Sequence, residues 1–329
     1  MTMSKGLRQE IKESLDSTSK FSYYKGCTCR VMKESRAITK DYLQTLVMQG
    51  SITKRHAFIL QVVNALGHAT CRMVQQLLAI QHRKYPLKEI PELTYEHLQK
   101  ELKYLSKNGL LVAYDFVTQE KSVIQIFSCS LYGYTFFRNC LETTISYDEN
   151  AIFRAEHETF KRLGANSVAL AMASDPNCND CSVNGRFSLV SVPKKFDAYV
   201  YAAVEFDFSG QKRLYIIEPT YFSIDYSIAT DEEEKVKISN RLDKLESIIS
   251  QFQKNYDGNV SAVYCVENMK SLIKLGQMIK DRYNNMYSMA LFTSENILYH
   301  NGYDLDRSFV KFEFGEKSLI TPWKDSWRL

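Results

Sequence analysis

The chain of 329 residues is long enough for two domains, since a domain usually contains about 100 to 200 residues. Its composition, with 45% hydrophobic and 24% charged residues, 13 Gly and 6 Pro, excludes a disordered, collagenous or low-complexity protein. The sequence has no apolar run near the roughly 20 residues that span a bilayer, and its first residues do not resemble a secretory signal. We therefore expect a cytoplasmic protein without a membrane partner.

The net charge of +4 is unevenly distributed along the sequence. Residues 1–110 contain 18 Lys and Arg against 9 Asp and Glu, whereas residues 111–329 contain 24 against 29. Neutralisation of phosphates supplies most of the non-specific affinity of proteins for nucleic acids. The N-terminal third is therefore the part that we expect to face a nucleic acid.

The first part of the chain is predicted to be helical. Residues 1–52 have weak periodicity, and we interpret them as a basic arm with one helix over 39–48. In the next segment apolar residues recur at helical spacing up to Gly67, which is typical of a helix C-cap. Thr70 and Thr94 are then predicted to cap two further helices.

A β-hairpin is predicted directly after the third of these helices. Asn108-Gly109 ends the helix, and two β-prone runs follow at 110–116 and 123–127. Three helices followed at once by a hairpin is the order of a winged helix, so residues 53–144 are predicted to form a winged-helix DNA-binding domain. A generic helical domain with a chance hairpin is the alternative.

The third helix is the expected DNA-reading element, because in a winged helix it normally enters the major groove while the hairpin flanks the phosphates. Its outward faces carry lysines, which bind phosphates or guanine edges, and a glutamine, which can read adenine. A solvated charged surface without a partner is the alternative. The predicted DNA-binding residues are Tyr95, Gln99, Lys100, Lys103 and Lys107 of this helix, with Lys121 of the hairpin and Arg72.

Residues 145–329 are predicted to form an α/β domain, a sheet with helices packed on it. Glu205 and Asp207 are expected beside a hairpin turn at Ser209-Gly210. The expected strands are 168–172, 187–192, 196–205, 213–218, 261–266 and 288–292, and the expected helices are 151–163, 235–254 and 269–283.

Two carboxylates of this domain could share a metal ion. Asp197 opens one strand and Glu218 ends the next, which brings two potential Mg²⁺ ligands to the same edge of the sheet. The order of helix, β-meander, helix and strand with these acids resembles the PD-(D/E)xK nuclease-like fold. That resemblance implies a catalytic lysine two positions after Glu218, but Thr220 stands there. A lysine of the long helix could replace it, and the candidates are Lys235, Lys237 and Lys244.

The expected fold class is therefore α+β, with an N-terminal winged helix-turn-helix domain followed by an α/β restriction-endonuclease-like domain. Together with the helix that contains His157, the strands of Asp197 and Glu218 and the long helix, this order resembles the replication-relaxation family of plasmid and mobile-element proteins. The resemblance covers roughly residues 53–300. It implies DNA binding in plasmid replication, DNA relaxation or conjugative transfer.

Site recognition without catalysis is the function that we expect, because the strand lysine is absent. Double-stranded DNA is the expected partner, and a homodimer or replication or transfer proteins are compatible with the resemblance. Two alternatives fit the same residues. One is a Mg²⁺-dependent endonuclease in which Asp197 and Glu218 hold the metal and Lys235 orients the water. The other is a transcriptional repressor whose second domain only dimerises.

Cys178 and Cys181 have the C-x-x-C spacing of a zinc-binding pair. A structural zinc site needs four ligands, and the sequence has no second pair with metal-binding spacing. We therefore interpret them as two loop cysteines without a metal, and a metal site at this pair is the alternative.

Overall fold

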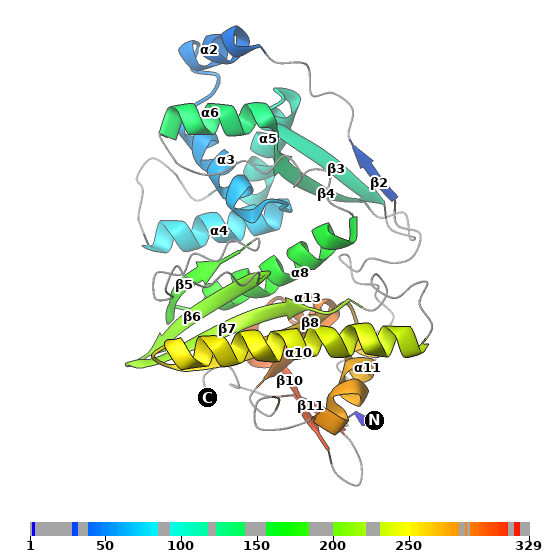
Figure 1. The fold of residues 1–329 in the computed structure, drawn as a ribbon. Coiled ribbons are helices and arrows are strands. Elements are labelled where there is room, and N and C mark those ends of the chain that lie inside the picture. The colour runs from blue at the N-terminus through cyan, green and yellow to red at the C-terminus, as the bar shows by residue number, and fades with distance from the viewer. Residues whose placement is uncertain are drawn as a thin grey trace. The chain divides into compact units, whose positions relative to one another are not determined.

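The computed structural model describes residues 2–3, 28–31, 39–84, 93–117, 123–141, 156–183, 200–221, 231–282, 287, 290–314 and 319–322. The protein is of the α+β class, and its chain divides into two units (Figure 1). The N-terminal unit contains residues 26–159, and the C-terminal unit contains residues 160–329 together with residues 1–25. Among the described residues, no helix is both long and apolar enough to cross a membrane.

The N-terminal unit combines helices with a small antiparallel sheet, whose strands lie in the order β2-β3-β4. The three predicted helices and the hairpin are all present, as is the helix expected over 39–48. The elements are β2 (Thr28–Val31), α2 (Lys40–Met48), α3 (Lys54–Leu66), α4 (Cys71–Lys84), α5 (Tyr95–Lys107), β3 (Leu111–Val117), β4 (Val123–Cys129) and α6 (Leu131–Leu141).

Local capping explains where these helices begin and end. The Thr70 hydroxyl accepts the Met73 N–H at the start of α4, and the Thr94 hydroxyl accepts the His97 N–H at the start of α5. Gly67 and Gly109 follow α3 and α5 with φ of +71°, a backbone conformation that favours glycine. The inward residues of α5 are fully buried, as its i, i+4, i+7 spacing predicts: Leu98, Leu102 and Leu105.

An additional bridge ties the link between α3 and α4 to the hairpin. Ala69 and Phe127 exchange both backbone hydrogen bonds, at 3.0 and 2.9 Å, so Ala69 pairs with β4 in antiparallel fashion. Directly after β4, the Ser130 hydroxyl donates to the Gly109 carbonyl and accepts the Gly133 N–H at the start of α6. The helices and the hairpin therefore share one core.

The C-terminal unit is built on one sheet, whose described strands lie in the order β1-β11-β10-β9-β8-β7-β6-β5. Strands β5, β6 and β7 form an antiparallel meander, and β7, β8 and β9 are parallel. The elements are β1 (Thr2–Met3), α8 (Glu156–Ala173), β5 (Cys178–Ser182), β6 (Ala202–Phe208), β7 (Gln211–Pro219), α10 (Asp231–Asn255), β8 (Asn259–Val266), α11 (Met269–Ile279), η1 (Lys280–Arg282), β9 (Leu291–Ser294), α13 (Glu295–His300), α14 (Leu305–Ser308), β10 (Val310–Glu313) and β11 (Leu319–Pro322).

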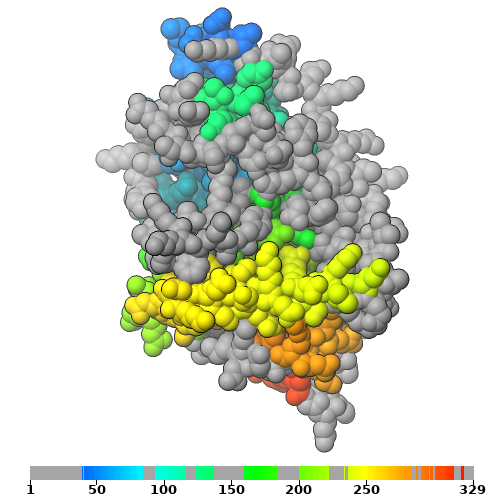
Figure 2. Space-filling model, in the orientation of Figure 1, coloured from blue at the N-terminus to red at the C-terminus, as the bar shows by residue number. Residues whose placement is uncertain are grey.

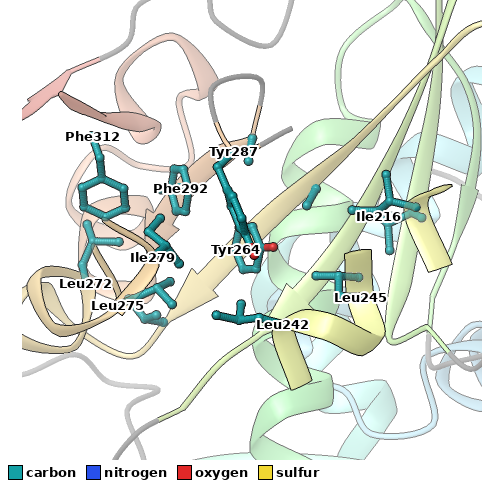
Figure 3. Packing of buried hydrophobic residues seen from close by; sticks show 14 of the residues in the cluster. Ile216, Leu242, Leu245, Tyr264, Leu272, Leu275, Ile279, Tyr287, Phe292 and Phe312 are labelled. Carbon is teal, nitrogen blue, oxygen red and sulfur yellow. The ribbon is translucent and has the colours of Figure 1, made fainter. Parts of the chain in front are cut away.

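One face of this sheet packs against α10 and α11 and forms a hydrophobic core (Figure 3). Aromatic side chains fill its centre: the Tyr264 ring stacks on Phe292, and Phe292 meets Phe312 edge to face at 4.5 Å. Helix α10 buries one side against the sheet and exposes the other, and its exposed side forms a yellow band in Figure 2. The helices predicted over 235–254 and 269–283 thus pack as expected, although α11 ends at Ile279 and continues as the short 3-10 helix η1.

The strand predicted at 168–172 is wrong, because these residues belong to the helix α8. Every residue from Thr159 to Ala173 is buried, so no exposed face recurs at the spacing of a helix or of a strand. A short apolar run of this kind does not distinguish a buried strand from a buried helix. The helix that we expected to end at Leu163 therefore extends to Ala173.

Two further expectations for this unit need correction or lie outside the description. The segment of Cys178 and Cys181 is the strand β5 rather than a loop, and the turn precedes it at residues 174–177. The strand predicted at 187–192 and the start of the one at 196–205 lie outside the described residues, and β6 begins at Ala202.

The basic arm is also more structured than predicted. Strand β2 joins the N-terminal sheet by pairing with β3, and β1 pairs with β11 of the C-terminal sheet. Sequence periodicity could not reveal strands as short as these two.

Candidate functional site

The predicted DNA-reading helix α5 presents a basic stripe to solvent. Lys100, Lys103 and Lys107 are all exposed and lie at i, i+3 and i+7, on the side opposite the buried leucines. Within the described part of the chain, none of these three lysines forms an ion pair. Their charges are therefore available to an anionic partner.

The other predicted DNA-binding residues are distributed around this stripe or lie elsewhere. Tyr95 is 44% exposed and Gln99 is half-buried, both on an adjoining side of α5. Arg72 is exposed on the neighbouring helix α4. Lys121 lies outside the described residues, so the structure describes no contribution from the tip of the hairpin.

On its other side, α5 is fastened to the start of α3 by polar contacts. Glu101 accepts hydrogen bonds from Arg55 at 2.5 Å and from His56 at 2.7 Å. One turn further along α5, the Tyr104 hydroxyl donates to the Ser51 carbonyl at 3.2 Å. The partners lie 46, 45 and 53 residues apart in the chain, so no local motif could have pointed to these contacts.

The predicted metal ligand Glu218 is paired with an arginine. It lies near the end of β7 on the face that packs against α10, where Arg241 Nε donates to Glu218 Oε1 and Nη2 forms an ion pair with the same oxygen. Arg241 Nη2 also donates to the Pro219 carbonyl at 2.8 Å, and its guanidinium lies 5.7 Å from the centre of the Tyr201 ring. This pair is largely enclosed, since the side chains of Glu218 and Arg241 are 11% and 22% exposed.

The remaining parts of the predicted catalytic site are only partly visible. Asp197 lies outside the described residues. Lys235 lies in α10, but its side chain is not described. Thr220, which stands at the lysine position of the nuclease-like motif, is 1% exposed, and its hydroxyl has no hydrogen-bond partner among the described atoms.

The described surroundings of Glu218 do not favour a divalent metal ion at this carboxylate. Arg241 already supplies the positive charge that balances Glu218, and a cationic guanidinium beside a carboxylate opposes metal binding there. Across the described residues, no three His, Cys, Asp or Glu side chains come together as a metal site. Cys178 and Cys181 form no disulfide, and the Cys178 thiol donates to the Asp180 carbonyl at 3.5 Å within β5.

No family model, curated protein or solved structure matches this chain.

A second polar cluster, which the sequence did not indicate, lies at the carboxyl ends of the parallel strands on the face opposite α10. The Tyr221 hydroxyl donates to Glu295, and Cys265 and Glu267 lie nearby. Burial, reinforced by Glu295, raises the pKa of Tyr221, and burial also raises the pKa of the Cys265 thiol. Both groups therefore stay protonated at neutral pH, which makes Cys265 a poor nucleophile.

Two more tyrosine–carboxylate pairs lie on the face of the sheet that packs against α10. Tyr256 donates to Glu205 at 2.9 Å, and Tyr287 donates to Glu246. The expectation that Glu205 decorates a hairpin turn is wrong, because it is 1% exposed and belongs to the core side of β6. Asp207 does lie at the predicted turn, where it accepts the Gly210 N–H.

Proposed function

We propose that this chain is a DNA-binding protein whose N-terminal unit recognises double-stranded DNA through α5 and whose C-terminal unit has a nuclease-like fold without cleavage activity. The observation that carries the proposal is the stripe of three exposed lysines on α5, none of which is in an ion pair with another described residue. A stripe of this kind on the last helix before a hairpin is where a winged helix meets DNA.

The order of elements supports a winged helix in the N-terminal unit. Helices α3, α4 and α5 are followed by the β3-β4 hairpin, and Ala69 between the first two helices adds a bridge to β4. The hairpin and these helices pack around one core, which buries the leucines of α5 and leaves its lysines outward. This is the geometry in which one helix can enter a major groove.

The nuclease-like interpretation of the C-terminal unit is supported by topology. Helix α8, the antiparallel meander β5-β6-β7, helix α10 and the parallel strand β8 follow one another in the order expected for that fold. Glu218 lies where the resemblance places a metal ligand, near the end of the third strand of the meander.

The absence of cleavage is proposed because of Arg241. In a nuclease the carboxylate at the position of Glu218 must be available to a metal ion, whereas here it accepts a hydrogen bond from a guanidinium and is ion-paired with it. Thr220 cannot act as the missing lysine, because its hydroxyl carries no positive charge. The C-terminal unit then serves assembly or DNA positioning.

The resemblance to the replication-relaxation family places this activity at an origin or transfer site of a mobile element, in plasmid replication, DNA relaxation or conjugative transfer. The partners would be double-stranded DNA, a second copy of the chain, and proteins of replication or transfer.

Salt-dependent binding to duplex DNA tests the proposal. Replacing Lys100 and Lys103 together with alanine should weaken binding and make the slope of log affinity against log salt concentration less negative by about 2, because each phosphate contact contributes roughly −0.9. The matched control replaces Lys270 and Lys280, which are exposed on α11 and η1, and should leave the slope unchanged. Equal slopes for the wild type and the α5 variant would refute the assignment of α5.

A plasmid assay tests the second half of the proposal. Supercoiled plasmid incubated with the full chain and Mg²⁺ or Mn²⁺ should remain intact. Nicking that is abolished by Asp197→Ala would show that the endonuclease alternative is correct.

A further inference from the structure

Polar contacts with the start of α3 add to the restraints that the buried leucines place on the rotation of α5 about its own axis. The leucines of α5 anchor it to the core, but apolar contacts have no directional preference. Glu101 and Tyr104 add directional hydrogen bonds from one side of the helix to Arg55, His56 and Ser51.

The hydrogen-bond pattern defines the role of His56. The backbone N–H of Thr53 can only donate, and it lies 3.0 Å from His56 Nδ1, so this nitrogen accepts. The ring hydrogen is then on Nε2 and is donated to Glu101 Oε2 at 2.7 Å. His56 is 5% exposed and its ring lies 5.4 Å from the ring of Tyr104. The N-terminus of α3, the imidazole and the carboxylate therefore form one continuous chain of hydrogen bonds.

An acid on a DNA-facing helix would normally oppose binding to phosphates. Here Arg55 offsets that effect, because its guanidinium donates to Glu101 Oε1 at 2.5 Å and balances the charge. The side chain of Glu101 is only 18% exposed, so its carboxylate points away from open solvent. The helix thus gains a directional anchor while its lysine stripe keeps its positive charge.

We propose that Glu101 is a positioning residue that sets the rotation of α5 on the DNA, with Arg55 neutralising its charge. The inference rests on the proposed DNA-binding function. Residues on the adjoining side, such as Gln99, reach base edges only when the helix is held at one angle, whereas lysines on flexible stems reach phosphates over a range of angles. Loss of the anchor should therefore impair sequence discrimination more than overall affinity.

The experiment compares two duplexes. One is selected from a random-sequence pool by the wild-type full chain, and the other is a scrambled version of it. Discrimination is the ratio of the two dissociation constants at one salt concentration. Glu101→Ala should reduce this ratio roughly tenfold, comparable to the loss of one specific base contact, and leave affinity for the scrambled duplex nearly unchanged. Glu101→Gln, which keeps an acceptor oxygen, should lie between the wild type and Glu101→Ala.

Two controls separate positioning from folding and from charge. Val63→Ala creates a cavity at a fully buried position of α3 without touching these contacts, and it should lower the melting temperature while keeping the ratio. Arg55→Gln leaves Glu101 without its counterion and should weaken binding to both duplexes, and Arg55→Gln with Glu101→Gln should restore affinity for the scrambled duplex but not the ratio.

The outcomes distinguish this inference from the proposed function. If the wild type binds no duplex, the proposed function itself fails. If the wild type discriminates and Glu101→Ala and Glu101→Gln keep the full ratio, or if Val63→Ala loses as much of it, Glu101 has no positioning role and only this inference is overturned.

Discussion

The two sets of charged residues that the sequence pointed to lie in opposite environments. The lysines of α5 lie in solvent, and none of them is paired with another described residue, whereas Glu218 of β7 is enclosed with Arg241. A charge held by an internal partner contributes to the fold, and a charge left in solvent can act on a ligand. The lysines of α5 are therefore the charges through which the proposed DNA binding can be tested, whereas Glu218 and Arg241 are tested through the stability of the C-terminal unit.

The same contrast extends to other ionisable groups of the C-terminal unit. Burial raises the pKa of five of its tyrosines among the described residues: Tyr215, Tyr221, Tyr256, Tyr264 and Tyr287. Three of them donate to carboxylates. The unit therefore depends on protonated phenols inside its core, and this dependence can be tested by pH.

The largest expected effect is alkaline unfolding of the C-terminal unit. A tyrosine with a raised folded pKa keeps its proton in the folded state, while the unfolded state loses it near pH 10. Stability from these groups is therefore complete below about pH 10 and falls as pH rises above it, by about 1.4 kcal/mol per pH unit for each fully buried phenol. Urea unfolding at a series of pH values, with hydrogen exchange to locate the unfolded segments, measures the loss.

Tyr264→Phe sharpens this measurement, because it removes one of the two tyrosines with the strongest burial effect while keeping the ring that stacks on Phe292. The variant should lose stability less steeply above pH 10 than the wild type. Tyr132→Phe, at an exposed position of α6, is the matched control and should follow the wild type. Parallel curves for all three proteins would contradict the assignment.

The next largest effect is expected for Arg241→Ala. The substitution leaves Glu218 enclosed without its counterion, which should lower the free energy of unfolding by about 3 kcal/mol. Adding Glu218→Gln should recover much of the loss, because the amide needs no counterion. The matched control is Arg307→Ala, whose pair with Asp304 is exposed and has an N–O distance of 3.6 Å, and its effect should stay below about 1 kcal/mol. Similar losses for both arginines would remove the contrast between enclosed and exposed charges.

Much of the N-terminal unit could be predicted because its signals are local. Thr94 caps α5 and Gly109 ends it within a few residues of the apolar positions that they delimit. By contrast, Glu101 meets His56 across 45 residues, and Glu218 meets Arg241 across 23. Partners of this kind depend on the packing of whole elements, which no spacing in the sequence encodes.

The errors in the C-terminal unit have a similar physical origin. The run at 168–172 is buried on all sides, so its pattern carries no period that separates a helix from a strand. The register of β5 on β6 shifts between Cys178 and Asp180. As a result, Cys178 pairs with Phe206 and Cys181 pairs with Val204, although the two cysteines are three residues apart. Polar residues in a strand are easily taken for a loop, and among the described strands β5 has only β6 as a neighbour.

A smaller loss is expected for Gly164→Ala in α8. A Cβ at this position would overlap the Tyr221 hydroxyl and lie 3.0 Å from Glu295 Oε1, so the buried pair would have to move. Overpacking of this kind costs about 2 kcal/mol. Thermal unfolding of the single variant, of Tyr221→Phe and of the double variant measures the coupling. The loss of stability in the double variant should be smaller than the sum of the losses in the two single variants, because Tyr221→Phe removes the atom that the new methyl meets. Full additivity would contradict this contact.

The smallest effect is expected at the N-cap of α5. Thr94→Ala removes the acceptor of the His97 N–H and should cost about 1 kcal/mol or less, because the site is exposed to water that can replace the hydroxyl. Thr39→Ala removes the equivalent cap of α2, whose hydroxyl accepts the Tyr42 N–H at 3.2 Å, and should cost a similar amount. Only Thr94→Ala loosens the turn that carries Tyr95, so only this variant should weaken DNA binding when both are compared by urea unfolding and by titration of duplex DNA. Equal DNA affinity of the two variants would mean that the start of α5 does not contact DNA, and the interface would then be confined to the lysines further along the helix.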